Sequence, residues 1–403
     1  MAPFGGSQGN LSDADSASVL PYGMARLAKL AFDGGDLKPL WRGLYDRFVA
    51  GRDEAAALMD LATIEQLFGN EAAAQACQKA ALERSLLYRS PQAGAAPGLR
   101  LLALAAPGDI GANTPLEFML DGSDIALDTL YVPPGKKPAL PSRGSYDLAI
   151  VAAGESDANR PVLAEIGRIA AALDLPLLND PAQVGRFSRE KVAALFAGAP
   201  GLLAPPVRRL GRGELAELSD FPFIVRPVDS HAGRGLARIT ETGERDAYLA
   251  ARAETSFFAT PFVDYRSADG LYRKYRIAFI DGRPFACHMA ISDGWMIYYL
   301  NAGMGESAEK RAEEARFMCE FDDGFARRHK AALGLIARRV GLDYFAIDCG
   351  EMPDGRLVLF EADIAMIVHA MDPPDLFPYK APQMRKVFDA FRAMLLARAG
   401  RAP

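Results

Sequence analysis

Three carboxylates are predicted to meet on one face of a β-hairpin near the C-terminal end of the chain. Two strand-like runs flank an Asp-Gly pair, which is typical of a tight hairpin turn. If Asp354 and Gly355 form the centre of that turn, Asp348 lies directly opposite Glu361. Asp363 follows Glu361 by two residues and therefore points to the same side of the strand.

Such a group of acids is costly without a cation. Two carboxylates about 4 Å apart repel each other by roughly 4 kcal/mol at an effective dielectric near 20. Mg²⁺ prefers oxygen ligands and usually takes one or two carboxylates together with phosphate oxygens. The neighbours Leu357 and Leu359 place this face at the edge of a core, where unpaired acids are disfavoured. We therefore predict a Mg²⁺ site, with a solvated acidic edge or pairing to arginines as the alternative.

A second feature is a glycine-bearing loop that follows a strand-like run ending in Arg226. The loop carries small, polar and basic residues, namely Ser230, His231, Gly233, Arg234 and Gly235. Glycines allow backbone N–H groups to approach an anion closely, and the two arginines add positive charge. The loop is therefore a candidate phosphate-binding loop, although many ordinary hairpin loops have the same composition.

The composition restricts the function classes. Half of the 403 residues are hydrophobic, the net charge is −5, and no basic segment stands out, which argues against a nucleic-acid partner. No apolar run is long enough to cross a membrane, and the acidic N-terminus lacks the apolar core of a signal peptide. The four scattered cysteines lack metal-ligand spacing, so we expect reduced thiols in a cytoplasmic protein.

The composition and the hydrophobic pattern change along the chain. Residues 1–14 are expected to form a disordered tail, and 15–90 a helical region whose spacing of small residues resembles one tetratricopeptide unit, with a plain helical bundle as the alternative. After a Pro/Gly/Ala linker, residues 98–185 alternate short apolar strands with helices, which predicts a parallel α/β domain. The remainder mixes helices with hairpins and is predicted to be α+β.

From about Phe187 to Met371, the order of segments resembles the ATP-grasp superfamily, most closely the glutathione-synthetase and RimK-type carboxylate–amine ligases. The segments that carry the resemblance are Ser188–Val192, Leu203–Pro206, Ile224–Pro227, Ser230–Gly235, Phe257–Val263, Tyr275–Phe279, Gly341–Asp348 and Glu361–Asp363. The resemblance implies an ATP-grasp domain with an N-lobe over 186–256 and a C-lobe over 257–400. The preceding α/β domain resembles the one that normally precedes this fold.

The resemblance also implies a role for individual residues. Lys191 and Arg226 would hold the α- and β-phosphates of ATP, and the glycine-bearing loop would cover the β- and γ-phosphates. Phe262 and Val263 would bind adenine through backbone groups, with Asp264 near the ribose. Arg276 would stabilise charge on the transferring phosphoryl group, and the three acids of the hairpin would bind Mg²⁺.

Several positions depart from the family pattern. Lys274 stands where these ligases usually carry Asp, so we expect it to contact an anionic substrate or phosphate beside Arg276. Asp363 stands where Asn is usual, which predicts an unchanged or tighter metal site. The segment 287–301 is aromatic and nearly free of charge, and it is expected to line the substrate pocket. Its candidate pocket residues are His288, Trp295, Tyr298 and Asn301, with packing in a core or lobe interface as the alternative.

Taken together, these features predict an ATP-dependent ligase that joins a carboxylate to an amine, or to a thiol, through an acyl-phosphate and releases ADP and phosphate. The substrates would be small-molecule or peptide carboxylates and amines. An ATP-binding regulatory protein without ligase activity and an ATP-grasp phosphotransferase are the alternatives. The N-terminal helices could bind a protein partner, mediate self-association or brace the sheet.

Overall fold

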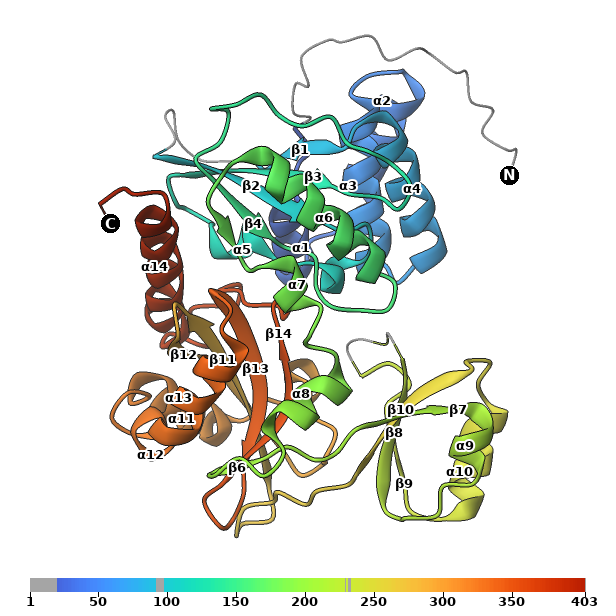
Figure 1. Ribbon diagram of the computed structural model, residues 1–403, viewed down its shortest axis with the longest axis vertical. Coiled ribbons are helices and arrows are strands. Elements are labelled where there is room, and N and C mark those ends of the chain that lie inside the picture. The colour runs from blue at the N-terminus through green and yellow to red at the C-terminus, as the bar shows by residue number, and fades with distance from the viewer. Residues whose placement is uncertain (1–19, 92–97, 229, 231–232, 403) are drawn as a thin grey trace.

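The computed structural model describes residues 20–91, 98–228, 230 and 233–402, and the predicted tail over 1–14 lies outside these residues. The chain forms an N-terminal group of helices, a parallel sheet, and two further sheets that lie side by side in the lower half of the molecule (Figure 1). The predicted fold class, a helical region followed by α/β and α+β units, is confirmed. No described helix has the length and apolar character that a membrane span requires.

The helical region comprises α1 (Met24–Phe32), α2 (Lys38–Val49), α3 (Glu54–Leu67) and α4 (Glu71–Arg84). Glycines with positive φ, Gly34, Gly51 and Gly69, lie in the connections between the helices. Helix α3 is the central element, because nine of its residues are buried. It packs against α4 as predicted, but a tetratricopeptide unit is not confirmed.

The helices end earlier than expected. Residues Leu87–Arg89, predicted within the helical region, form β1, which pairs antiparallel with the parallel sheet. The backbone of Ser85 is already extended, and Leu87 and Tyr88 are buried, so the run fits a sheet edge better than another helical turn. The helical region is therefore joined to the next domain by a shared strand.

The second unit is a five-stranded sheet of order β1-β3-β2-β4-β5, in which every pair except β1–β3 is parallel. Its other elements are β2 (Leu99–Ala105), η1 (Ile110–Ala112), α5 (Leu116–Met119), β3 (Ile125–Tyr131), β4 (Leu148–Val151), α6 (Arg160–Leu173), β5 (Leu177–Leu178) and α7 (Pro181–Val184). The continuous apolar strands are buried on both faces, as parallel strands are. The predicted parallel α/β domain is thus present.

The third unit, the N-lobe, is an antiparallel four-stranded sheet of order β7-β10-β8-β9 with helices packed against it. Its elements are β7 (Arg208–Gly211), α9 (Arg212–Ala216), β8 (Phe223–Pro227), β9 (Ala237–Ile239), α10 (Thr242–Ala250) and β10 (Ser256–Pro261). Because Phe257 to Pro261 pair with β8, the segment assigned to the start of the C-lobe belongs to the N-lobe sheet.

The fourth unit, the C-lobe, is a five-stranded sheet of order β12-β11-β13-β14-β6. It contains α8 (Arg189–Phe196), β6 (Leu202–Leu203), β11 (Tyr272–Ile280), β12 (Arg283–Ser292), η2 (Tyr299–Asn301), α11 (Ala308–Cys319), α12 (Phe325–Arg328), α13 (Lys330–Val340), β13 (Tyr344–Glu351), β14 (Leu357–Asp363) and α14 (Lys380–Arg398). Helix α8 and β6 were expected in the N-lobe, but β6 pairs with β14 and α8 packs on it.

The two faces of the C-lobe sheet have different surroundings. On one face Tyr275 packs its ring against Phe317 of α11 and Phe325 of α12. On the other face Tyr344 packs against Phe391 of α14. Since side chains alternate along a strand, Asp348 lies on the same face as Tyr344. This second face, beyond the end covered by α14, carries the candidate site.

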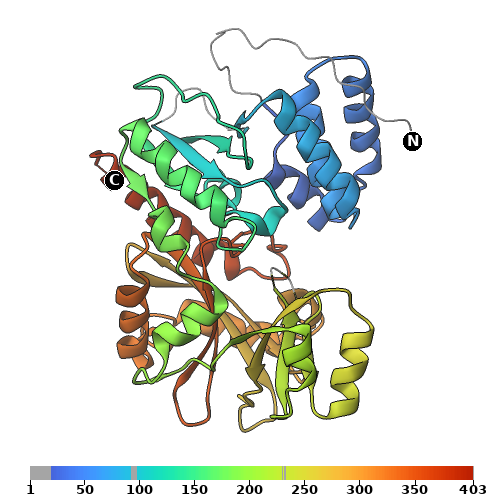
Figure 2. The same cartoon turned by 45° about the vertical axis from the view of Figure 1, so that its right-hand side comes forward.

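The α/β domain is fixed to the C-lobe. The side chain of Asn179 is fully buried; it donates to the Tyr344 carbonyl at 2.9 Å and accepts from the Tyr344 N–H at 3.0 Å. Gly154 lies so close to the end of β14 that a Cβ there would be 2.9 Å from the Cβ of Ala365. Figure 2 shows the resulting arrangement, with the parallel sheet above both lobes and the N-lobe set beside the C-lobe.

Candidate nucleotide and metal site

The acidic hairpin forms as predicted, although its turn differs. Asp348 pairs directly with Glu361 across β13 and β14, and Asp363 pairs with Ala346 on the same face. Between Asp348 and the turn, a β-bulge shifts the pairing of the two strands by one residue. The turn is therefore centred on Asp354 alone, and the bulge restores the predicted pairing of the two acids.

Asp348 belongs to a row of four ionisable side chains that crosses the sheet. His288, Arg276, Asp348 and Glu361 lie directly opposite one another on β12, β11, β13 and β14. Arg276 donates from Nε and Nη2 to the two oxygens of Asp348 at 2.8 and 3.0 Å. Lys274 approaches the same carboxylate, with 2.8 Å between Nζ and Oδ2. Burial alone would raise the pKa of Asp348, but these two cations outweigh burial and hold that pKa well below its usual range.

Glu361 and Asp363 are more accessible than Asp348. The Glu361 side chain is 24% exposed, against 4% for Asp348, and it forms an ion pair with Arg189 of α8. Asp363 accepts a hydrogen bond from the Ala365 N–H at 2.9 Å. Both acids line a cleft together with Glu155, Arg189, Arg209 and Ser230. The α/β domain, the N-lobe and the C-lobe thus all contribute to one cleft.

The acidic side chains of the site can be compared with the ligands that Mg²⁺ requires. Within the described residues, no three acidic, histidine or cysteine side chains are gathered as metal ligands. Asp348 does not fit, because its two oxygens are occupied and a divalent ion about 5 Å from one cation is repelled by roughly 7 kcal/mol at an effective dielectric near 20. Glu361 and Asp363 do fit, since Mg²⁺ bound with a nucleotide commonly uses only one or two carboxylates.

Arg276 and Lys274 are therefore placed differently from expectation. The remaining terminal nitrogen of Arg276, Nη1, donates to the carbonyl of Ile367 at 2.9 Å. Both side chains are more than four-fifths buried. In this arrangement they neutralise Asp348.

Glu155, which follows β4, was not recognised in the sequence as a site residue. It lines the cleft with Glu361 and Asp363. Burial, Glu190 and Asp363 raise its pKa to about 7. Its position at the carboxyl end of a parallel strand, where ligand sites concentrate, was the signal that could have identified it.

The phosphate-binding candidates of the N-lobe have a contrasting environment. Arg226 donates from Nε to the Ser230 hydroxyl at 3.0 Å and from Nη2 to the Ser230 carbonyl, and that hydroxyl donates to the Pro227 carbonyl at 2.7 Å. No ion pair of Arg226 occurs within the described part of the chain. Burial and the nearby charge of Arg189 lower the pKa of Arg226 to about 10. A partly buried cation whose hydrogen bonds, among the described residues, go to neutral groups is suited to an anionic ligand.

The remainder of the glycine-bearing loop is partly described. Gly233 and Gly235 adopt positive φ values of 72° and 67°, as a tight loop requires. Arg234 reaches across to the N-terminal helices and pairs with Glu71 of α4 at 2.8 Å. His231 lies outside the described residues.

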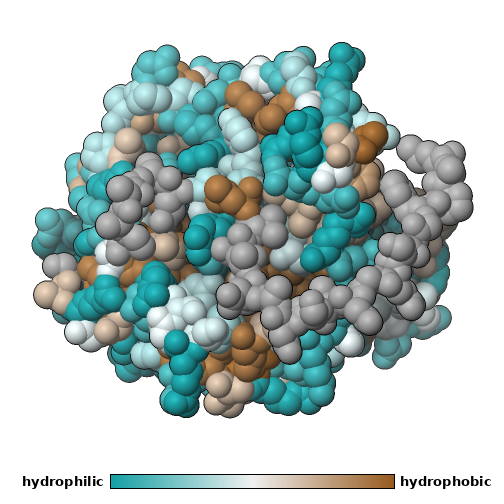
Figure 3. Space-filling model, turned by 90° about the horizontal axis from the view of Figure 1, so that it is seen from above, coloured by the Kyte–Doolittle hydropathy of each residue, from teal (hydrophilic) through white to brown (hydrophobic). Residues whose placement is uncertain are grey.

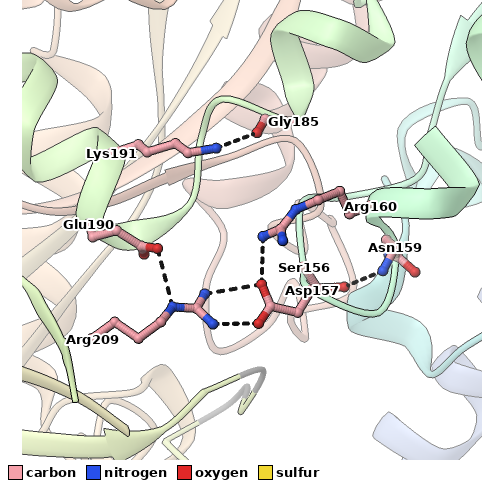
Figure 4. A network of polar contacts seen from close by, with 8 residues as sticks. All are labelled: Ser156, Asp157, Asn159, Arg160, Gly185, Glu190, Lys191 and Arg209. Atoms are coloured by element: carbon pink, nitrogen blue, oxygen red, sulfur yellow. Dashed lines mark hydrogen bonds and ion pairs between the residues drawn. The ribbon is translucent and has the colours of Figure 1, made fainter. Parts of the chain in front are cut away.

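Lys191 and its neighbours connect α8 to the other units (Figure 4). Lys191 donates to the Gly185 carbonyl at 3.1 Å, so it is not yet directed to a phosphate position. Beside it, Arg209 of β7 forms ion pairs with Asp157, which follows β4, and with Glu190 of α8. Arg160 also pairs with Asp157. This network fixes the N-lobe to the α/β domain, and single-segment motifs gave no indication of it.

The expected adenine-binding segment follows β10. The Phe262 N–H already donates to the Pro222 carbonyl at 3.0 Å, and the Phe262 ring lies under the Arg238 guanidinium, 3.9 Å from its centre. Val263 is partly buried against the main core. Asp264 is exposed and pairs with Arg266, which lowers its pKa.

Of the four residues expected to line a substrate pocket, Tyr298 and Asn301 contact each other, and His288 lies beside Tyr299 of the same segment. The rings of His288 and Tyr299 are tilted with centres 5.0 Å apart, and burial together with Arg276 lowers the pKa of His288 well below its usual value. Trp295 packs edge-on against Phe262, while Tyr298 is 43% exposed. Asn301 accepts from the Tyr298 N–H and donates to the Met296 carbonyl, both at 3.0 Å. Asn301 therefore stabilises the turn of its own segment.

No protein-family model matches the sequence, and none of the curated proteins matches it. Among solved structures, the chain is similar to D-alanine–D-alanine ligase from Bacillus anthracis complexed with ATP, at 12% identity and a TM-score of 0.44, over 75% of this chain and 97% of that one. It is also similar to the VanG D-Ala:D-Ser ligase from Enterococcus faecalis, at 14% identity and a TM-score of 0.45, over 74% and 99%. A RimK domain ATP-grasp protein from Sphaerobacter thermophilus matches at 17% identity and a TM-score of 0.42, over 74% and 99%.

Proposed function

We propose that this protein is an ATP-grasp enzyme that binds ATP in the cleft between its lobes and uses it to join a carboxylate to an amine or a thiol. The observation that carries the proposal is the environment of Arg226. This cation is partly buried near a second cation, Arg189, and its hydrogen bonds are to neutral groups of Ser230. Glu361 is the carboxylate that acts on both cations, and a polyphosphate would supply further negative charge to them.

The opposite wall of the cleft supports the same proposal. Glu361 and Asp363 lie on it with Glu155 nearby, and this crowding of acids favours a cation. Mg²⁺, when bound with the nucleotide, would neutralise phosphate oxygens and make the terminal phosphorus easier to attack. Glu361 and Asp363 would hold it, and Arg189 would then be free to turn from Glu361 to a phosphate oxygen.

In the proposed reaction, an oxygen of the substrate carboxylate attacks the terminal phosphorus and the bond to the ADP oxygen breaks. The amine or thiol then attacks the acyl carbon, and phosphate leaves with the electron pair of the broken C–O bond. Such transfers depend mainly on positioning and positive charge. Arg226 and Arg189 would supply that charge, with Lys191 joining them by leaving the Gly185 carbonyl. Arg276 and Lys274 are omitted from this role because they neutralise Asp348.

ADP release measured with Mg-ATP, across a panel of amino acids, dipeptides and small carboxylates, tests the proposal. We expect one carboxylate–acceptor pair to stimulate release and Glu361→Gln to abolish that stimulation. A protein that fails to bind ATP at all would contradict the proposal.

A second candidate is an ATP-binding protein that docks a partner and does not turn ATP over. Exposed apolar side chains on the N-terminal helices, including Tyr45 and Val49 of α2, favour it. Figure 3 shows, however, that apolar side chains on the described part of the upper surface lie in small separate groups within a mostly hydrophilic face. Tight ATP binding without stimulated release by any pair in the panel would favour this candidate.

A further inference from the structure

Two cationic side chains contact Asp348, and their contacts bear on the number of metal ions that a nucleotide would bring into the cleft. Asp348 accepts from Arg276 at 2.8 and 3.0 Å and contacts Lys274 at 2.8 Å, and its side chain is only 4% exposed. A carboxylate has about four acceptor positions on its two oxygens, and three are used here. Its charge is thus more than balanced from within the chain.

The groups beside this carboxylate reinforce the point. His288 flanks Arg276 on the next strand, and burial and Arg276 keep it neutral. Arg276 is fixed on its far side by the Ile367 carbonyl at 2.9 Å. Arg276 is therefore held on both sides by groups of the protein, and these contacts keep it against Asp348.

Glu361 differs although it is the direct cross-strand neighbour of Asp348. It is 24% exposed, and its ion-pair partner among the described residues, Arg189, is 27% exposed and stands on a helix at the cleft. An arriving phosphate can compete for Arg189 much more readily than for the buried Arg276. Asp363 lines the same cleft two residues further along the strand.

We propose that Lys274 and Arg276 are permanent counter-ions of Asp348, so that a nucleotide bound in this cleft carries a single divalent ion held by Glu361 and Asp363. The inference rests on the proposed ATP site. It makes Lys274 a positioning residue that restricts metal binding to one position, and not a contact for substrate.

The test is a titration of Mn²⁺ into the full chain with a non-hydrolysable ATP analogue, in which free Mn²⁺ is followed by electron paramagnetic resonance and nucleotide binding by calorimetry. Three chains are compared: the wild type, Glu361→Gln, and the double variant Lys274→Met with Asp348→Asn. The double variant removes one charge of each sign, and its Asn oxygen still accepts from Arg276. A thermal melt of each chain confirms that it is folded.

We expect the wild type to bind one Mn²⁺ per bound nucleotide. Glu361→Gln should weaken Mn²⁺ binding by about tenfold or more, whereas the double variant should match the wild type. Two Mn²⁺ ions per nucleotide, or weakening in the double variant equal to that in Glu361→Gln, would overturn this inference and leave the ATP proposal intact. Absence of nucleotide binding by the wild type would overturn both.

Discussion

Two charged side chains beside the cleft are held in different ways. In the N-lobe, Arg226 is partly buried, donates to neutral groups of Ser230 and lies near Arg189, and the charge of Glu361 also acts on it. In the C-lobe, Asp348 is buried against Arg276 and Lys274, which use three of its four acceptor positions. Among the described residues, Arg226 has no carboxylate at ion-pair distance, whereas Asp348 has two cations at that distance. Burial alone therefore does not identify a ligand-binding group, because the partner decides whether the charge serves binding or stability.

The largest expected effect comes from removing one of the two cations that contact Asp348. Arg276→Met should lower the free energy of unfolding by about 3–5 kcal/mol, because it leaves a buried carboxylate with Lys274 as its only cation. Denaturant titration of the purified protein measures this. As a matched control, Arg276→Met and Lys274→Met combined with Asp348→Leu remove the whole charge cluster and should recover much of the loss. A single variant as stable as the wild type would show that the contact between Arg276 and Asp348 does not stabilise the fold.

Replacing Arg226 in the N-lobe is expected to have a smaller effect on stability and a large effect on ATP binding. Arg226→Met should weaken ATP binding by about 1.5–3 kcal/mol, since it removes a charged donor from the phosphates. The free energy of unfolding should stay constant or rise, because the side chain lost is a partly buried cation that forms no ion pair with a described carboxylate. Calorimetric ATP titration and denaturant titration together test both halves. Destabilisation without loss of ATP affinity would show that Arg226 serves stability and not ATP binding.

A third prediction extends the comparison to an acid that forms no ion pair within the described part of the chain. Asp60 of α3 is 3% exposed and accepts from the Tyr22 and Gly23 N–H groups at 2.6 and 3.1 Å. Burial raises its pKa from 3.8 to about 6. The folded protein therefore binds a proton that the unfolded chain releases, so the stability from this group is complete below pH 4 and lost as pH rises through 6.

The loss is on the order of 3 kcal/mol for a shift of about two pKa units. Asp60→Asn should remove this part of the pH dependence, which urea titrations of both chains between pH 4 and 7 would reveal. Asp348 must behave in the opposite sense, because a depressed pKa gives stability that is lost as pH falls. An equal pH slope in the wild type and Asp60→Asn would contradict the assignment to Asp60.

The sequence predicted the local geometry of the site better than its charge pairing. The facing of Asp348 and Glu361 followed from strand alternation and an Asp-Gly turn, which are properties of one short segment. The partners of these acids come from elsewhere in the chain: Arg276 and Lys274 from β11, and Arg189 from α8. Which cation meets which carboxylate depends on the packing of distant elements, so spacing along the chain could not decide between a metal site and pairing with arginines.

The same reasoning explains the misplaced boundaries. Strand β10 consists of an apolar run that fits either lobe equally well, and only its pairing with β8 assigns it to the N-lobe. Strand β1 is three residues long and follows a helix directly, so a helical period conceals it. By contrast, β2 and β4 are continuous apolar runs within the segment predicted to alternate short apolar strands with helices, and both form strands there.

The smallest expected effect concerns the contact between the glycine-bearing loop and the N-terminal helices. Arg234 and Glu71 lie 2.8 Å apart, but their side chains are 57% and 60% exposed. Such a pair contributes about 0–1 kcal/mol to stability and weakens with added salt. Glu71→Ala and Arg234→Ala should each change stability only within that range.

The two variants should nevertheless differ in ATP binding. If Arg234 turns to a phosphate when the nucleotide is bound, Arg234→Ala weakens ATP binding, whereas Glu71→Ala leaves it unchanged or strengthens it by removing a competing partner. Calorimetric titration with ATP at low and high salt separates these outcomes. Equal weakening by both variants would mean that the helical region itself holds the loop over the phosphates, which would make these helices part of the nucleotide site.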